Sequence, residues 1–451
     1  MKLMERGLSA LPAFDPLCRH LRASTTAAVT GLGHIHKVLL IQTLCAAADK
    51  RAVVLTADEA EATRLSEDLQ ALGRQVMLLP ARDLSLRQVE SASREYEQQR
   101  LGVFSAMLGG DYDCVIACVD AAIQHTLPPE LLSMRTIDVM AGKRLPVDDL
   151  AAALTAAGYQ RCDQIEGAGQ FAVRGGIYDL FPANSPTPIR LELWGDEVDT
   201  LSRFDLLTQR RTESLDALSI PPAAEISCDD PAELAEKIEA LAASLRGKTA
   251  AIQRENLLAD ASKLRGGAAL ASLDKYIPLI YEHPATLFDY ADGAALFVSE
   301  PTRVKERVRT ARWQLEEDVK TLLEEGQLCR GLSEYALDWS GVTAEMERRG
   351  AILLDAFAHS GQDIRLSGLY NINARQLPVW SGNLELLCED LRDMLSRGQA
   401  CVVLAGAEEK TAQVLAEDLV KQGVPALYAP SPEAPLKGRV LVVRGGLSAG
   451  F

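Results

Sequence analysis

Short, continuous apolar runs alternate with longer amphipathic segments in the first quarter of the chain. Strands are predicted at 52–55, 76–79 and 114–117, and helices at 39–48, 58–72 and 87–107. Strands that are apolar at nearly every position are buried on both faces, as in parallel sheets covered by helices. The pattern therefore predicts an α/β fold built on a doubly wound parallel sheet.

The pattern changes to a period of two between residues 189 and 194. Apolar side chains at the odd positions alternate there with polar or aromatic ones at the even positions. Together with a strand-like run at 176–181, this alternation predicts half-buried strands in a small α+β unit. Arg190 and Trp194 then share the solvent face. Because Trp and Arg are enriched at interfaces, a partner surface is one interpretation; a Trp that caps a neighbouring hydrophobic edge is the other.

Apolar runs and helical segments return beyond this unit. A strand is predicted at 294–298, and a long, heavily charged helix at 301–325 is expected to be an exposed connector on a face of the sheet. Near the end of the chain, 401–423 repeats the strand-and-helix arrangement of 52–73, which predicts a separate small parallel-sheet domain. The chain thus divides into the segments 1–120, 121–212, 213–340 and 350–451.

The composition of the chain mainly excludes classes of function. The 451 residues carry a formal net charge of −16, which argues against a chain that wraps nucleic acid unaided. The nine cysteines form no C-x-x-C pair, and Cys114, Cys118 and Cys401 are expected to be buried thiols. No metal-ligand spacing and no catalytic nucleophile stand out. No apolar run approaches the length of a membrane span, and we expect a cytoplasmic protein.

The loop that begins at Gly31 lies where a phosphate-binding loop would precede the first helix. A Walker A motif reads G-x-x-x-x-G-K-[ST]. Gly31 and Lys37 match it, whereas His36 replaces the second Gly and Val38 replaces the Ser or Thr that binds magnesium. An imidazole would crowd the phosphate, and valine supplies no metal ligand. We therefore expect Gly31, Gly33, His36, Lys37 and Val38 to form a non-functional remnant that holds neither ATP nor magnesium.

Residues 171–205 also resemble a known family. The matching text reads FAVRGGIYDLFP from Phe171, IRLELW from Ile189, DEV from Asp196 and LSRFD from Leu201. In order and spacing it is similar to the domain that the repair protein UvrB shares with the transcription-repair coupling factor Mfd, through which both bind UvrA.

One departure from UvrB decides between these two relatives. UvrB carries a long, tyrosine-rich β-hairpin in this neighbourhood, whereas residues 80–86 run almost directly into the next helix here. No aromatic platform is left for stacking on bases, which argues against independent DNA binding. With the incomplete phosphate-binding loop, this makes the chain more similar to the N-terminal region of Mfd than to UvrB.

The resemblance implies a specific architecture and a contact surface. Segment 121–212 would be a UvrA-binding domain inserted into a degenerate, helicase-like nucleotide-binding domain, whose sheet 213–340 completes. The UvrA contact would involve Arg174, Arg190 and Trp194, the last where the family more often has Phe. Guanidinium groups suit this task because they pair bidentately with carboxylates. The competing interpretation is that both arginines pair with carboxylates of their own sheet.

The resemblance further implies transcription-coupled nucleotide excision repair, with this module recruiting UvrA to lesions where RNA polymerase has stalled. The RNA-polymerase contact and the ATP- and magnesium-dependent motor on double-stranded DNA would lie in other parts of the full-length protein. Residues 445–451 follow a core strand without a polar tail, so we expect a piece of a longer chain. An alternative is a UvrB-like, ATP-dependent helicase-type enzyme acting on damaged DNA; a weaker one is a purely structural domain pair.

Overall fold

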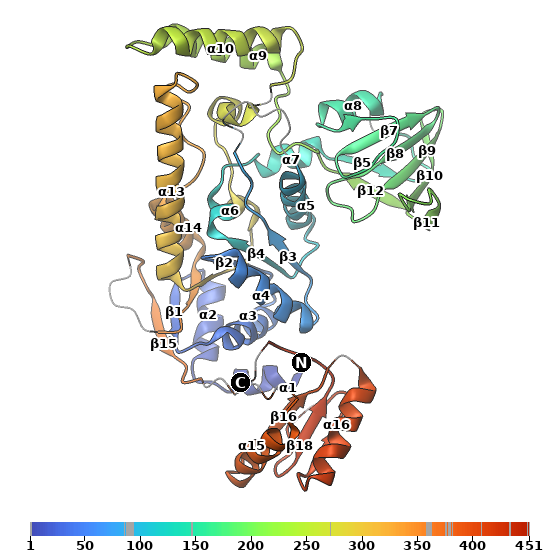
Figure 1. The fold of residues 1–451 in the computed structure, drawn as a ribbon, viewed down its shortest axis with the longest axis vertical. Helices are drawn as coiled ribbons and strands as arrows, with labels where there is room; N and C mark the ends of the chain where they lie inside the picture. The colour runs from blue at the N-terminus through green and yellow to red at the C-terminus, as the bar shows by residue number, and fades with distance from the viewer. Residues whose placement is uncertain are drawn as a thin grey trace.

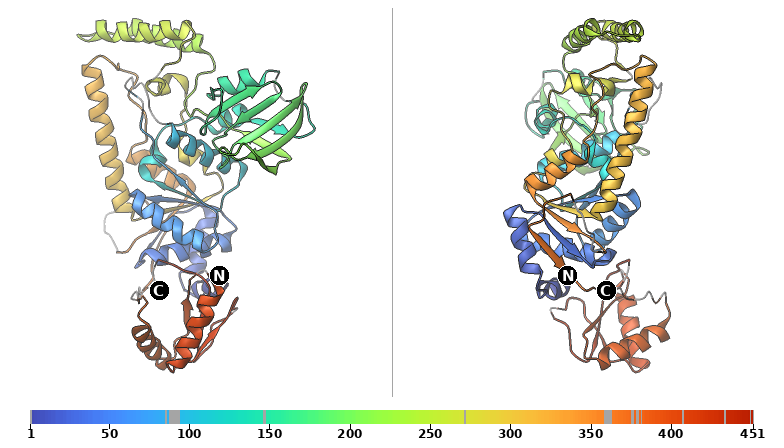
Figure 2. Two further views of the ribbon diagram at one scale, coloured as in Figure 1. Left: turned by 45° about the vertical axis from the view of Figure 1, so that its right-hand side comes forward. Right: turned by 90° about the vertical axis from the view of Figure 1, so that its left-hand side faces the viewer.

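The computed structural model describes residues 2–450 except 85, 87–93, 146–147, 271, 358–362, 375–376, 378–379, 381, 407, 433 and 449. The molecule is elongated. A central α/β domain carries a β-rich domain at its side, a helical hairpin at one end and a small α/β domain at the other (Figure 1 and Figure 2).

Seven strands form the sheet of the central domain, in the order β15-β1-β14-β13-β2-β4-β3, and every pair is parallel. The predicted strands at 52–55, 76–79 and 114–117 are all present, so the α/β fold with a large parallel sheet is confirmed. Most of the seven strands are buried on both faces, as their apolar runs predicted. The strands are β1 (Ala27–Thr30), β2 (Ala52–Thr56), β3 (Val76–Leu79), β4 (Cys114–Cys118), β13 (Ala295–Ser299), β14 (Ala351–Leu354) and β15 (Gly368–Asn371).

Helices cover both faces of this sheet, each face with its own apolar core. The helix predicted at 39–48 begins earlier, at His34, because Gly33 takes the extended N-cap conformation. The start of the helix predicted at 87–107 lies outside the described residues. One face packs against α2 (Phe14–Ala23), α3 (His34–Ala48) and α4 (Glu59–Ala71), with α1 (Lys2–Ser9) nearby; the other packs against α5 (Glu95–Gly109), α6 (Val119–Ile123), α12 (Leu287–Tyr290), α13 (Pro301–Glu324) and α14 (Trp339–Arg349).

The long helix α13 spans the expected residues and lies on a face of the sheet, as predicted. It contributes more to the core than an exposed connector would. Val304, Val308, Val319 and Leu322 are buried and contribute to the core on one face of the sheet. Residues spaced three or four apart lie on one side of a helix, so these four form an apolar stripe beneath a charged surface.

The β-rich domain is inserted between β4 and β13. Its curved sheet has the order β11-β10-β9-β8-β7-β6 and is antiparallel except between β6 and β7. The apolar residues of this sheet pack against α8 and a two-stranded ribbon, β12-β5. Its elements are α7 (Pro129–Arg135), which leads in, β5 (Ile137–Met140), α8 (Leu150–Ala156), β6 (Gln160–Arg161), β7 (Gln170–Arg174), β8 (Ile177–Leu180), β9 (Ile189–Trp194), β10 (Glu197–Phe204), β11 (Arg211–Ser214) and β12 (Ala217–Ile220).

A helical hairpin of α9 (Pro231–Ser244) and α10 (Ala250–Arg265) forms the far end of the molecule (Figure 1). Short helices then lead back to β13: η1 (Leu273–Tyr276) and α11 (Ile277–Ile280), followed by α12.

The small domain at the opposite end is shorter than the pattern suggested. Residues 351–354 and 368–371, which the pattern placed in the last segment, instead supply β14 and β15 to the central sheet. The small domain's own sheet has three parallel strands in the order β16-β18-β17. Its elements are α15 (Leu384–Ser396), β16 (Cys401–Leu404), α16 (Glu409–Lys421), β17 (Ala426–Tyr428) and β18 (Val440–Val443).

The residues that follow β18, from 444 to 448, form a strap that connects the small domain to the central one. The backbone N–H of Ser448 donates to Asp68 Oδ1 at 2.7 Å, and the Ser448 hydroxyl donates to Asp68 Oδ2 at 2.5 Å. His34 Nε2 lies 2.8 Å from the same Oδ2 atom. Asp68 on α4 therefore holds the strap beside the loop that precedes α3.

The predicted thiols lie where the sequence placed them. Cys114, Cys118 and Cys401 are buried free thiols, as predicted, and burial raises the pKa of Cys118 to about 11. Among the described residues no group of His, Cys, Asp and Glu could hold a metal ion. None of the helices in the described part of the chain is long and apolar enough to cross a membrane.

Candidate functional site

The outer face of the inserted sheet brings most of the predicted contact residues together. Strand register aligns Arg174 on β7 with Ile177 on β8, and Ile177 with Glu192 on β9. Residues Ile189 and Leu191 point to the opposite side, into the domain core. The outer face thus carries the polar half of the period-2 pattern, as the sequence predicted.

Trp194 and Arg174 are the accessible members of this face. Trp194 ends β9 and is 84% exposed. The exposed guanidinium of Arg174 donates to the Asp163 carbonyl at 2.9 Å, and no carboxylate among the described residues forms an ion pair with it. Both side chains can therefore be contacted by another molecule without first breaking an internal ion pair.

Arg190 is held mainly by groups of its own domain. It lies on the outer face, but only 16% of its side chain is exposed. Arg190 Nε donates to Asp179 Oδ1 at 2.6 Å and its Nη2 to Oδ2 at 2.9 Å, in a bidentate pair across β8 and β9. The guanidinium also lies over the ring of Phe204, 4.6 Å from its centroid, and bonds to Gln209.

Arg190 is covered because a second, small apolar cluster lies on the outer side of the sheet, separate from the domain core. Ile165, Ala172 and Phe204 are buried there. The chain after β10 turns back over this cluster and covers Arg190 with Gln209. The structure therefore shows Arg190 paired within its own sheet, as the competing interpretation had it, and its role as a UvrA contact stays a prediction. Alternation along one strand does not reveal what a neighbouring loop covers. The partner of Arg190 is Asp179, a carboxylate that the sequence pattern did not single out.

Two apolar residues that the sequence did not single out add to the accessible surface. Ile177 is 37% exposed beside Arg174, and Leu207 is 94% exposed in the turn after β10. Glu192, in contrast, is occupied by Arg211, whose hydrogen bond lowers the pKa of the Glu192 carboxyl. The accessible surface therefore combines the guanidinium of Arg174 with the exposed apolar side chains of Ile177, Trp194 and Leu207, a composition found where interfaces concentrate their energy.

The loop at Gly31 is closed by the chain's own groups. Gly31 has a φ of +86°, and a Cβ there would lie 2.2 Å from the carbonyl oxygen of Ile372, which follows β15. The N–H of Leu32 donates to the Asp355 carbonyl at 3.1 Å, and the N–H of Gly33 donates to His36 Nδ1 at 3.1 Å. These are the backbone donors that a phosphate-binding loop would offer to a phosphate.

Lys37 is equally occupied. It is 4% exposed, and its Nζ donates to Ser299 Oγ at 2.8 Å and to Glu300 Oε1 at 2.5 Å. Glu61 Oε1 lies 3.7 Å from the same nitrogen and accepts the Ser299 hydroxyl at 2.5 Å. Val38 is fully buried in the core under α3. The carboxylates of Glu61 and Glu300 thus occupy the surroundings of Lys37 Nζ in which phosphate oxygens would have to lie.

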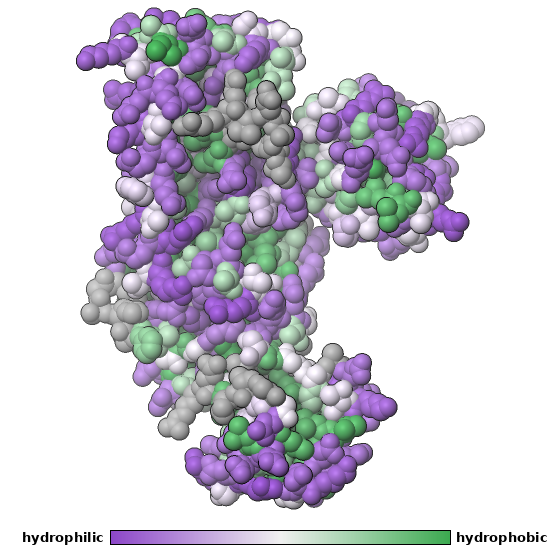
Figure 3. All heavy atoms as spheres, in the orientation of Figure 1, coloured by the Kyte–Doolittle hydropathy of each residue, from purple (hydrophilic) through white to green (hydrophobic). Residues whose placement is uncertain are grey.

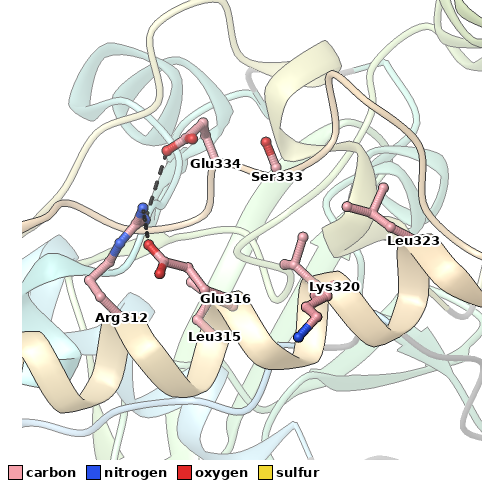
Figure 4. Close-up of a pocket in the computed structure, with 8 residues that line it drawn as sticks. Arg312, Leu315, Glu316, Lys320, Leu323, Ser333 and Glu334 are labelled. Carbon is pink, nitrogen blue, oxygen red and sulfur yellow. Dashed lines mark hydrogen bonds and ion pairs between the residues drawn. The ribbon is translucent and has the colours of Figure 1, made fainter.

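A small hollow lies elsewhere, between α13 and residues 333–334 (Figure 4). Its volume is about 180 Å³. Arg312 reaches across it, 3.3 Å from Glu316 and 3.8 Å from Glu334. Both carboxylates already neutralise the one guanidinium in the hollow, so the arrangement is that of a structural ion pair.

Comparison with known proteins agrees with the geometry of the inserted domain. Residues 137–226 match the family model described as the UvrB interaction domain. This range begins at β5 and ends just after the buried linker that follows β12, so it coincides with the inserted domain.

Proteins named transcription-repair-coupling factor match over most of the chain. The protein from Bacillus subtilis is 30% identical over 94% of this chain and 36% of its own length, and that from Staphylococcus haemolyticus is 24% identical over the same shares. The protein from Haemophilus influenzae is 32% identical over 54% of this chain and 21% of its own length. Where the match covers most of this chain, it covers only about a third of the length of the relative.

A solved structure titled "Structure of S. tokodaii Xpd4" aligns with 96% of this chain and 79% of its own, at 10% identity and a TM-score of 0.25, too low to support an argument. The sequence matches are decisive. The chain belongs to the transcription-repair-coupling factor family, as its N-terminal, UvrB-like part.

Proposed function

We propose that this chain is a recruitment module of transcription-coupled nucleotide excision repair, and that its inserted domain binds UvrA through the outer face of β7–β9. The observation that carries the proposal is the exposure of Trp194 and Arg174 together on one face of a domain that matches the UvrB interaction family. An indole that is 84% exposed leaves a large apolar surface in water, which is typical of a residue that a partner buries.

The central domain serves this function as a scaffold. Its fold is that of a degenerate, helicase-like nucleotide-binding domain that binds no ATP and no magnesium, since Lys37 and the loop N–H groups already have internal partners. ATP hydrolysis, translocation on double-stranded DNA and the contact with RNA polymerase belong to the rest of the full-length protein.

The calorimetric test is a titration of this chain with UvrA. Arg174→Ala and Trp194→Ala should each weaken binding, by roughly tenfold or more if these residues are hot spots. Glu385→Ala, on the exposed first turn of α15 far from the inserted domain, is the matched control and should leave the affinity unchanged. Unaltered binding by the Arg174→Ala/Trp194→Ala double variant would place the interface elsewhere.

The alternative, a UvrB-like ATP-dependent enzyme, makes a separate prediction. A nucleotide that binds the folded state at about a hundred times its dissociation constant adds about 2.7 kcal/mol to stability. Thermal unfolding with and without ATP and magnesium should show no such stabilisation here. A stabilisation that is lost in Lys37→Met would instead support the enzyme.

A further inference from the structure

Among the residues that the structure describes, no strand lies beside the edge of the central sheet at β3. β3 is last in the strand order and pairs only with β4. The N–H of Cys114 on β4 donates to the Gln75 carbonyl, so Gln75 directs its backbone groups toward β4. In a parallel ladder every second residue of a strand faces the same neighbour. Met77 therefore directs its backbone groups toward β4, and Val76 and Leu78 direct theirs outward. An edge of this kind is a template for another strand.

This edge forms one wall of a groove between the central and the inserted domain. The groove has a volume of about 770 Å³ and is lined by β3, α5, residues 183–186 and the neighbouring ends of β5 and β12. In the space-filling view the inserted domain projects from the side of the central domain (Figure 3). A volume of this size accommodates a short extended peptide.

The two walls of the groove are held in place. A Cβ on Gly102 of α5 would lie 2.8 Å from the Ala183 carbonyl oxygen, so helix and loop approach as closely as backbones allow. Asn184 Nδ2 donates to the Ser219 carbonyl at 3.0 Å, and the Ser219 hydroxyl donates to Asp138 Oδ1 at 2.5 Å. The groove is therefore preformed, and an incoming strand would not have to order it.

The lining has a definite charge. Asp111 and Asp138 are its charged members, and no lysine or arginine is among the described residues that line it. Apolar contacts are offered by Met77 and by Leu108, which is 43% exposed at the end of α5. Carboxylates repel the phosphates of a nucleic acid and attract cationic side chains.

We propose that this groove binds an extended, basic segment of a partner protein, which pairs with the outer edge of β3 and displaces the 3.5 Å hydrogen bond that Gln70 Nε2 donates to the Val76 carbonyl. The partner's backbone would bond to Val76 and Leu78, as in other complexes in which a peptide adds a strand to a sheet. Its lysine or arginine side chains would reach Asp111 and Asp138. The site is separate from the proposed UvrA surface, because neither Arg174 nor Trp194 lines the groove.

The test uses two labelled peptides of about six residues, the length of an average strand. One alternates lysine with valine, and the other alternates glutamate with valine. In fluorescence anisotropy titrations the lysine peptide should bind this chain, whereas the glutamate peptide should not. Hydrogen exchange at the amides of Val76 and Leu78 should slow in the complex with the lysine peptide.

Substitutions in β3 and in the groove distinguish backbone hydrogen bonding from electrostatic attraction. Leu78→Pro removes an outward N–H at an edge position, where proline is tolerated, and should weaken binding about tenfold, the factor that about 1.4 kcal/mol represents. Leu78→Thr keeps the N–H and is the matched control, with affinity near wild type. Asp111→Asn/Asp138→Asn should weaken the lysine peptide and leave the fold, checked by circular dichroism, unchanged.

Three results would overturn the proposal. Equal binding of both peptides would remove the charge argument. If Leu78→Pro fails to fold, the hydrogen-exchange experiment on wild type decides, and unprotected Val76 and Leu78 amides would exclude strand addition. A dimer in sedimentation experiments that Leu78→Pro dissociates would show that a second copy of this chain covers the edge.

Discussion

Replacing Arg190 with alanine should destabilise the inserted domain. The guanidinium makes two hydrogen bonds to Asp179 at 2.6 and 2.9 Å and covers the ring of Phe204 at 4.6 Å. Its removal leaves the Asp179 side chain, 7% exposed, without its cationic partner in a partly apolar setting. The variant therefore loses more than one attractive contact, because a buried carboxylate stays behind.

The magnitude follows from these contacts. Hydrogen bonds to a charged partner contribute about 1.5–3 kcal/mol and a partly buried cation–π contact about 1 kcal/mol. With the cost of the uncompensated carboxylate, the loss should be about 3–5 kcal/mol. For a domain of this size each kcal/mol lowers the melting temperature by about 4–8 °C, so the midpoint should fall by about 12–40 °C.

Differential scanning calorimetry of the whole chain measures this directly, because the transition of the inserted domain should shift alone. Trp194→Ala is the matched control on the same face. Its side chain is 84% exposed, so its effect should stay within about 0.5 kcal/mol. The double variant Asp179→Ala/Arg190→Ala should recover part of the loss, since it removes the stranded carboxylate.

The outcome separates two roles for Arg190. Unfolding of Arg190→Ala at the wild-type temperature, combined with lost UvrA binding, would refute the assignment of Arg190 as a structural residue and restore it as a contact. A double variant no more stable than Arg190→Ala would contradict the argument about the buried carboxylate.

Two further predictions concern the central domain. Burial raises the pKa of the Glu225 carboxyl, but the charges of Arg100 and Arg82 outweigh burial and hold this pKa below its usual value. The ion pair between Arg100 and Glu225 therefore stabilises the fold above about pH 4.3 and loses this contribution as the carboxyl protonates in acid. Arg100→Met should therefore cost about 3–5 kcal/mol at neutral pH. Chemical denaturation at pH 7 and at about pH 3, below the unfolded pKa of a glutamate, should show a smaller difference between variant and wild type in acid, whereas an equal difference at both pH values would contradict the reasoning. Asp68→Ala should release the strap, seen as faster hydrogen exchange at the Ser448 amide, with Asp418→Ala on exposed α16 as the control; unchanged exchange would show that other contacts hold the strap.

Much of this fold follows from the sequence alone. Continuous apolar runs identified β2, β3 and β4, because strands of a parallel sheet are buried on both faces and have no polar alternation. The period of two identified β9 and assigned its residues to the correct faces. The mismatched residues His36 and Val38 marked the loop before α3 as unlike a phosphate-binding loop, and Trp194 was identified as exposed.

The tertiary structure decided what distant segments do to these elements. Arg190 is covered because residues 205–209 fold back over Phe204, and Lys37 is neutralised by Glu300, which is 263 positions away in the chain. β14 and β15 joined the central sheet although their sequence neighbours form another domain. Periodicity describes which side of its own element a residue occupies. Pairing, covering and the open edge of β3 depend on contacts between elements, which no local pattern contains.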